Sequence, residues 1–219
     1  MAISWPELST AHIEEKAASF RLDAIQTLGL EAGGPVPVEQ IAEIYLGYEL
    51  DFVEQDESLP SDVIGGIDFD NKTIIVNSSI ESHLGRYSFT IAHEIAHHVL
   101  HREIFMESRT DDKIMCRGGK SRPIEEMQAD RFAEALLMPK ELVITTSHSI
   151  QTARPMFHKG RIALASKVIK ASGLSNVSVT AMAMRLQHLN LSTRSGWFGN
   201  YIRWALKRIG RKLNKKGYL

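Results

Sequence analysis

The chain has 219 residues, of which 43% are hydrophobic and 24% are charged, and its 26 Lys and Arg residues balance 26 Asp and Glu residues. This length and composition fit one globular domain, or one domain with a small extension. The sequence has no apolar run long enough to span a bilayer, no secretory signal at its start and only one cysteine, so we expect a protein without internal disulfides in a reducing, cytoplasmic setting.

The charges are distributed unevenly along the chain. Residues 1–141 hold 12 basic residues and all 26 acidic ones, a net charge of −14, whereas residues 142–219 hold 14 basic residues and no acid, a net charge of +14. Such an asymmetry indicates either that the basic part packs on the acidic part or that it binds an anionic partner.

The first half of the chain predicts helices followed by short strands. Apolar residues at helical spacing predict a helix over residues 7–30 and a short one over 37–46. Strand candidates follow at 49–54, 64–69 and 73–77. The last two flank Asp70-Asn71-Lys72, a pattern typical of a hairpin.

Residues 81–102 predict a helix that carries the pattern His93-Glu94-Ile95-Ala96-His97. Positions i and i+4 lie on one face of a helix, so these two imidazoles can hold one zinc ion. Glu94 lies between them and can act as a general base on a water molecule. This is the arrangement of zinc-dependent peptidases; the alternative is an amphipathic helix whose histidines are solvated or buried in a core.

A catalytic zinc site also needs a third protein ligand. His101 continues the series, but three ligands at successive i+4 positions span about 12 Å of a straight helix and cannot converge on one ion. His98 points about 100° away from His97. Cys116 could supply a thiolate from the segment 103–122, which predicts a polar loop.

The best third ligand is Glu126, on a helix predicted over residues 123–137. Pro123 and the acidic residues after it are typical of a helix start. Asp130 lies one turn beyond Glu126 and is placed to accept the free ring N–H of a ligating histidine. Glu125 is the alternative ligand, although it lacks an acidic residue four positions on.

Two strings of this sequence resemble the ImmA/IrrE family of metallo-endopeptidases. The string 86–101 resembles the family's active-site helix, and 126–139 resembles its E-x-x-A-(N/D)-x-F-A-x-x-L-L-M-P block. Weaker matches lie at 63–77 and 177–186, so that the resemblance covers residues 35 to 190.

The resemblance implies zinc ligands His93, His97 and Glu126, with Glu94 catalytic. It also implies that the substrate is a helix-turn-helix transcriptional repressor of phage, mobile-element or stress genes. Two histidines and a carboxylate suit Mn²⁺ and Fe²⁺ as well as Zn²⁺. The group that stabilises the oxyanion is left open among Tyr87, His98 and His148.

The predicted fold class is α+β, a mostly helical, zincin-like catalytic domain with a small antiparallel β-sheet or hairpin before the HExxH helix. We expect an N-terminal helical segment over 1–34, the metallopeptidase domain over 35–192 and a basic aromatic tail over 193–219. Two further helices, broken at Gly173, are predicted over 160–190.

Residues 194–219 interleave aromatic and basic side chains. Such a segment could lie on an anionic membrane surface, bind nucleic acid or dock on the acidic part of the chain. The alternative function is therefore a non-proteolytic regulatory protein, whose metal site is structural or sensing and which binds DNA or a repressor. The oligomeric state is not predicted.

Overall fold

In the computed structural model, the described residues are 4–30, 33–54, 64–108, 114–117, 123–153 and 161–191, with the backbone alone for 114–117 and 152–153. The chain divides into two compact units. Unit 1 comprises Met1–Lys140 and Gly173–Ser178, and unit 2 comprises Glu141–Ser172 and Val179–Leu219. The three-part division expected from the sequence stays a prediction, and the basic tail lies outside the described residues.

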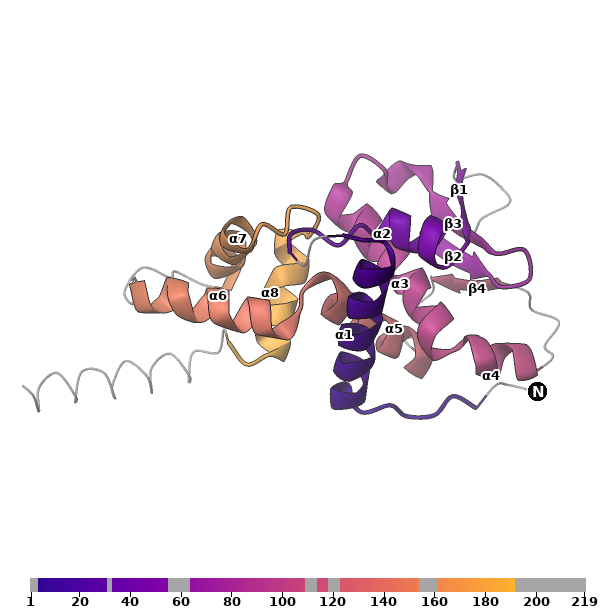
Figure 1. The fold of residues 1–219 in the computed structure, drawn as a ribbon, viewed down its shortest axis with the longest axis horizontal. Coiled ribbons are helices and arrows are strands. Elements are labelled where there is room, and N and C mark those ends of the chain that lie inside the picture. The colour runs from indigo at the N-terminus through magenta and orange to yellow at the C-terminus, as the bar shows by residue number, and fades with distance from the viewer. Residues whose placement is uncertain are drawn as a thin grey trace, which may run out of the picture. The chain divides into compact units, whose positions relative to one another are not determined.

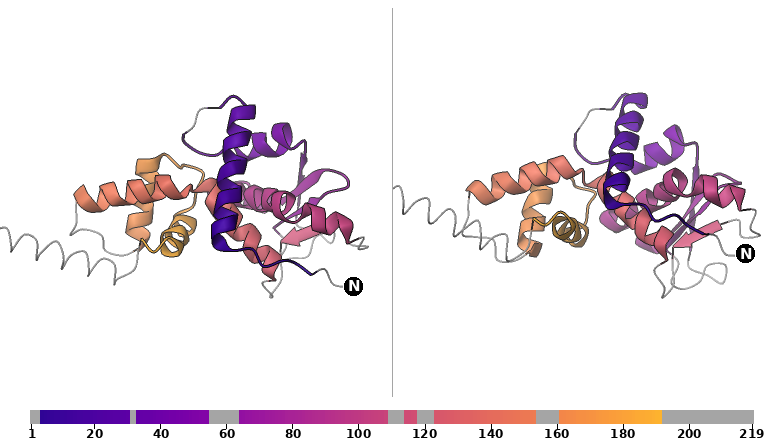
Figure 2. Two further views of the ribbon diagram at one scale, coloured as in Figure 1. Left: turned by 60° about the horizontal axis from the view of Figure 1, so that its bottom comes forward. Right: turned by 90° about the horizontal axis from the view of Figure 1, so that it is seen from below.

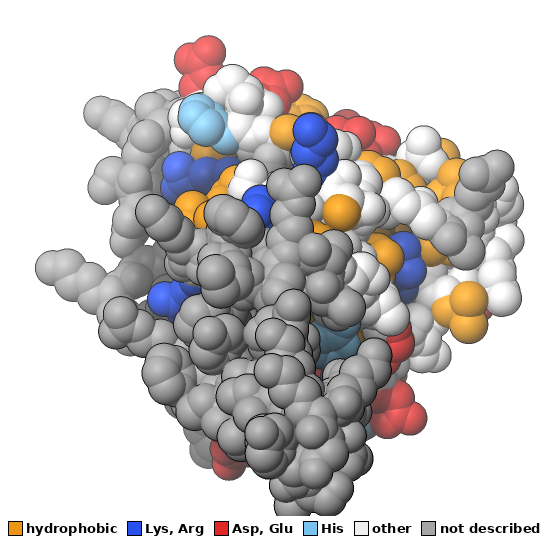
Figure 3. All heavy atoms as spheres, turned by 90° about the vertical axis from the view of Figure 1, so that its left-hand side faces the viewer, with side chains coloured by type: hydrophobic (Ala, Val, Ile, Leu, Met, Phe, Trp, Pro, Cys, Tyr) orange, Lys and Arg blue, Asp and Glu red, His pale blue; other side chains and the backbone are white. Residues whose placement is uncertain are grey.

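The two units separate the charges of the chain. Unit 1 carries 12 basic residues against 25 acidic ones, a net charge of −13, and unit 2 carries 14 basic residues against one acid, a net charge of +13. Lys and Arg side chains lie beside hydrophobic ones on the face drawn in Figure 3. Among the described residues, none of the helices combines the length and the apolar character needed to cross a membrane.

Unit 1 holds the helices and strands from α1 to α5 (Figure 1). In chain order they are α1 (Thr10–Thr27), α2 (Val38–Gln40), the π-helix η1 (Ile41–Tyr45), β1 (Glu49–Val53), β2 (Gly65–Asp68), β3 (Thr73–Asn77), the 3₁₀-helix η2 (Ser78–Ile80), α3 (Leu84–Leu100), α4 (Arg102–Glu107), β4 (Ile114–Arg117) and α5 (Ile124–Leu137). The α+β, mostly helical class predicted from the sequence is therefore confirmed.

The four strands form one mixed sheet in the order β1-β3-β2-β4. The predicted hairpin is present: β2 and β3 pair antiparallel, and Asp68 Oδ1 accepts hydrogen bonds from the backbone N–H groups of Asp70 and Asn71. The expected antiparallel pairing is wrong for β1, which pairs parallel to β3. The chain reverses its direction between β1 and β2 and again between β2 and β3, so β1 and β3 run in the same direction.

The helix α3 lies at the centre of unit 1. It packs against β2 and β3 on one side and against α5 on another, while α1 packs against α5 (Figure 2). Ile91 and Ile95 of α3 are fully buried, and nearly every residue from 87 to 97 is buried as well. Each such aliphatic side chain contributes about 1.5–3 kcal/mol to folding, so the helix with the HExxH pattern is fixed firmly in the core.

The segment 103–122, expected to be a polar loop, instead contains α4 and β4. The strand β4 pairs antiparallel with β2, with Gly65 opposite Arg117. This pairing joins residues about 50 positions apart, and local sequence patterns do not reveal such contacts. The loop prediction was therefore wrong at both elements.

Unit 2 contains the last three helices, apart from the first residue of α6. They are α6 (Lys140–Ala153), α7 (Arg161–Ser172) and α8 (Val179–His188). The helices α7 and α8 pack together, and Leu164 and Val168 of α7 and Leu186 of α8 are buried. Gly173 has φ +73°, a left-handed conformation that glycine adopts at low cost. It ends α7 where the sequence predicted the break.

Candidate metal centre

Three predicted ligands meet at one point between α3 and α5. His93 and His97 lie one turn apart on α3, and their Nε2 atoms are 3.0 Å apart. Glu126, in the first turn of α5, places Oε2 at 3.2 Å from Nε2 of His93 and Oε1 at 3.2 Å from Nε2 of His97. Both imidazoles are fully buried, whereas the Glu126 side chain keeps 18% of its surface exposed.

These distances fit the donor set of a small divalent cation. Zinc binds imidazole nitrogen and carboxylate oxygen at about 2.0–2.2 Å, so two ligands of a tetrahedral site lie about 3.3 Å apart. In this cluster the two Nε2 atoms are 3.0 Å apart, and each lies 3.2 Å from one oxygen of Glu126. A ligand set of two histidines and one glutamate leaves a position for a water molecule or a substrate.

Asp130 contacts the other side of the His93 ring. Its Oδ1 atom lies 3.0 Å from Nδ1 of His93, and an ionised carboxylate can only accept a hydrogen bond. The Nδ1–H of His93 therefore donates to Asp130, and Nε2 presents its lone pair to the centre of the cluster. This is the contact that the sequence predicted for Asp130.

Burial and charge set the protonation of the cluster. Burial lowers the pKa of His97, and Glu126 offsets this effect only in part. Burial also opposes ionisation of Glu126, but its polar contacts with His93 and His97 hold the pKa of this carboxyl well below its usual range. At neutral pH the cluster thus contains a neutral His97 imidazole and an ionised carboxylate, the forms in which both groups bind metals.

Glu94 lies on the same helix and is 1% exposed. The strand β2 approaches it closely at Gly65, where an added Cβ would lie 2.6 Å from Cγ2 of Thr90 and 3.1 Å from Oε1 of Glu94. Gly65 and Thr90 were not among the site residues predicted from sequence. The detectable signal is a glycine inside a strand, which often marks a close approach of the backbone to another group.

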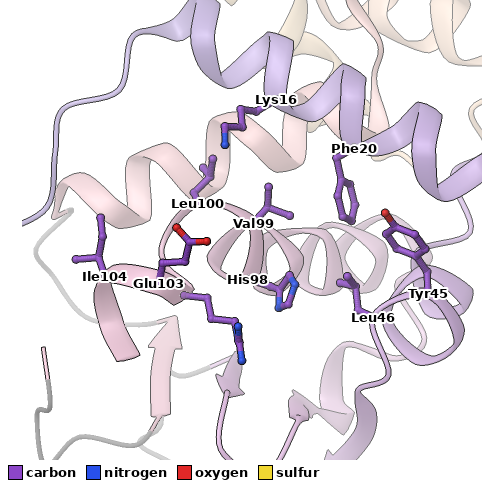
Figure 4. A pocket seen from close by; sticks show the side chains of 10 residues that line it. Lys16, Phe20, Tyr45, Leu46, His98, Val99, Leu100, Glu103 and Ile104 are labelled. Atoms are coloured by element: carbon purple, nitrogen blue, oxygen red, sulfur yellow. The ribbon is translucent and has the colours of Figure 1, made fainter. Parts of the chain in front are cut away.

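The remaining sequence candidates lie elsewhere. Nδ1 of His98 bonds the Tyr48 hydroxyl, and its ring lines an open pocket of about 650 Å³ with Phe20, Tyr45 and others (Figure 4). The Tyr87 hydroxyl donates to Oε1 of Glu39 at 2.6 Å.

Two further candidates whose side chains the structure describes are not in the cluster. His148 lies on α6 in unit 2, and Glu125 is next to Glu126 without belonging to the group of ligand atoms. The side chain of Cys116 lies outside the described residues. His101 also contributes no atom to the cluster, as its spacing on the helix predicted, although it contacts His97 from the outer side.

Comparison with known proteins agrees with this geometry. A protein-family model, the Peptidase M78 family described as an IrrE N-terminal-like domain, matches residues 48–166. The match covers the whole of α3 and of α5, and therefore all three residues of the metal cluster. No curated protein matched the chain. Because the family model covers more than half of the sequence, the chain belongs to the Peptidase M78 family of IrrE N-terminal-like domains, the ImmA/IrrE family that its motifs resemble.

Proposed function

We propose that this protein is a zinc-dependent endopeptidase whose metal is held by His93, His97 and Glu126. Its family supports a metallopeptidase-type function. The observation that carries the proposal is the meeting of two imidazole Nε2 atoms and a carboxylate within 3.2 Å of one another. Two imidazole nitrogens and an ionised carboxylate that converge in this way form the donor set of a catalytic metal site. Mn²⁺ and Fe²⁺ accept the same donors, so the metal must be identified by measurement.

In the proposed reaction, water attacks the carbonyl carbon of a peptide bond of the substrate. A bound zinc ion supplies a Lewis acid for the carbonyl oxygen and makes water more acidic. Glu94 takes one proton from the attacking water and passes it to the nitrogen of the leaving amine as the C–N bond breaks. Asp130 keeps the His93 ring oriented through its hydrogen bond to Nδ1.

The proposed substrate is a helix-turn-helix transcriptional repressor of phage, mobile-element or stress genes. This part of the proposal rests on the family resemblance, supported by one property of the chain. Unit 1, which contains the metal cluster, has a net charge of −13. DNA-binding proteins carry basic surfaces, and complementary charge increases the rate of association between two proteins.

A second candidate is a regulatory protein that does not cleave its partner. The observation that favours it is the charge of +13 on unit 2, which suits DNA or an anionic membrane. In this case the metal would be structural or sensing, with Cys116 closing a four-ligand site.

Metal content tests the site directly. We expect about one zinc per chain in the purified protein and its loss in His97→Ala and in Glu126→Ala, since two remaining ligands make a weak site. Glu125→Ala is the matched control, because it removes the neighbouring carboxylate and should keep the metal. Zinc retained in Glu126→Ala would contradict the ligand set and move the third ligand to Glu125 or Cys116.

Glu94→Gln tests the mechanism. The amide has nearly the same shape but cannot take up a proton, so cleavage of a repressor substrate should stop while the zinc content stays at the wild-type level. Both are measured on the same preparation, by electrophoresis of the substrate and by elemental analysis. Undiminished turnover by this variant would exclude Glu94 as the base and leave the non-proteolytic alternative to be tested with Cys116→Ser.

A further inference from the structure

A chain of buried polar contacts leads away from the metal cluster toward the start of the protein. Nδ1 of His97 lies 3.0 Å from Nδ1 of His101, and Nε2 of His101 lies 3.0 Å from Oε1 of Gln128. The side-chain amide of Gln128 then donates to the backbone carbonyl of Pro6 at 2.7 Å. His97, His101 and Gln128 are each at most 4% exposed, so water does not compete freely for these contacts.

The direction of every hydrogen bond follows from the last contact. A backbone carbonyl can only accept, so the nitrogen of the Gln128 amide faces Pro6 and its oxygen faces His101. The oxygen must receive a proton, and Nε2 of His101 therefore carries its N–H. In the neutral imidazole, Nδ1 of His101 then has the lone pair and accepts from Nδ1–H of His97. This leaves the lone pair of His97 on Nε2, the atom that faces Glu126.

The N-terminal segment closes this chain of contacts from outside. The ring of Trp5 packs edge-on against the ring of His101, with 5.1 Å between the ring centroids. Trp5 thus contacts His101, and Pro6 contacts Gln128, although 122 residues separate Pro6 from Gln128 in sequence. The segment before α1 is consequently connected to the metal cluster through the ring of Trp5 and the backbone carbonyl of Pro6.

We propose that His101 and Gln128, held by the carbonyl of Pro6, are positioning residues that keep His97 in the tautomer that binds metal and so raise the metal affinity of the cluster. The two histidines are oriented from opposite sides: Asp130 fixes His93, and the relay of His101, Gln128 and Pro6 fixes His97. This inference rests on the proposed function, because it assumes that His97 is a ligand.

The experiment measures zinc affinity of the full-length protein by competition with a chromophoric chelator. Removing a group that orients a metal-binding histidine lowers metal affinity by about 10- to 100-fold, and we expect this loss in His101→Leu. His101→Asn places an amide oxygen near the position of Nδ1 and should restore most of the affinity. Gln128→Met has nearly the same shape without polar atoms, and it should lower the affinity less, since its effect passes through His101.

A second readout separates positioning from simple loss of structure. The ¹⁵N shifts of the His97 ring in metal-free protein report which nitrogen carries the proton. We expect the proton on Nδ1 in the wild type and a mixture of tautomers in His101→Leu and Gln128→Met. His98→Gln is the matched control, because His98 faces Tyr48 and takes no part in the relay.

The outcomes distinguish this inference from the proposed function. A wild-type protein that binds no metal contradicts the proposed function itself. Tight zinc binding in the wild type that His101→Leu and Gln128→Met leave unchanged overturns the relay alone. If His101→Leu fails to fold, Gln128→Met and the recovery by His101→Asn decide the question.

Discussion

Gly65 is the residue whose replacement should disturb the site most directly without removing a ligand. A Cβ at this position would meet Cγ2 of Thr90 at 2.6 Å, Oε1 of Glu94 at 3.1 Å and the backbone oxygen of Ile75 at 3.3 Å. Gly65→Ala must therefore displace the Thr90 methyl group or separate β2 from α3, and it also crowds the carboxylate of Glu94. Overpacking of this kind costs about 1–3 kcal/mol, and we expect lower stability in urea together with reduced peptidase activity.

A second glycine of this protein supplies the control for this substitution, and Thr90 supplies the rescue. Gly33→Ala adds a Cβ in open space and should change neither property. Combining Gly65→Ala with Thr90→Ser removes the methyl group of the closest contact and should recover part of the lost stability. Wild-type stability and activity in Gly65→Ala alone would show that the close approach has no consequence.

At the scale of elements, α3 determines how the metal-free protein responds to acid. His97, His98 and His101 lie on this helix or at its end. Burial lowers the pKa of His97, and burial with neighbouring positive groups lowers the pKa of His98 and of His101 to about 4. In the unfolded chain these imidazoles titrate near about 6.5.

This difference predicts that the metal-free protein loses stability as the pH falls from about 6.5 to about 4. In that range the unfolded chain binds protons that the folded chain does not, so the free energy of unfolding falls with pH. The lowered pKa of Glu126 adds a loss in the same direction, which begins as the pH enters the range in which a free carboxyl titrates and continues below it. Urea unfolding of chelator-treated protein at pH 7.5 and 5.0 measures the effect.

His98→Asn should reduce this pH dependence, whereas His12→Gln changes an exposed residue of α1 and serves as the control. An equal or higher urea midpoint at pH 5.0 would contradict the prediction. The sign is the same for the buried His97 and His101 and for the half-buried His98, so no cancellation among the three can hide it.

Elements with strong local patterns were predicted closely, and those made by distant contacts were not. The helix α5 was predicted to start at Pro123 and begins one residue later, at Ile124. The strand β3 has the predicted bounds. The helix α3 begins at Leu84 rather than at residue 81, next to a close approach in which an added Cβ on Gly85 would lie 2.6 Å from the backbone nitrogen of Ser178. Ser178 lies more than 90 residues further on, and this contact has no signature near Gly85.

The metal cluster was largely predictable because its chemistry is encoded in short spacings. The i, i+4 pairs His93–His97 and Glu126–Asp130 each place two groups on one helix face, and geometry of a single helix suffices to find them. Gln128 and Pro6 were not found, since their roles depend on how α5 and the N-terminal segment pack around His101. A glutamine in a helix and a proline before one give no specific signal.

At the scale of the whole molecule, the family match and the sequence resemblance agree on the part of the chain that holds the metal cluster. The family model ends at residue 166, within α7, whereas the weaker resemblance continues over α8 and stops before the basic tail. Their amino-acid composition is nevertheless distinctive, because every acidic residue of the protein precedes residue 142.

The charges of the two units also govern how copies of this protein behave toward each other. Unit 1 has a net charge of −13 and unit 2 a net charge of +13, so that the whole chain is neutral. Each unit attracts the oppositely charged unit of a neighbouring molecule. At low ionic strength this attraction extends over tens of ångströms, and it is screened within about 8 Å at physiological salt. The protein should therefore salt in: modest additions of NaCl dissolve it, and dialysis into water favours its precipitation.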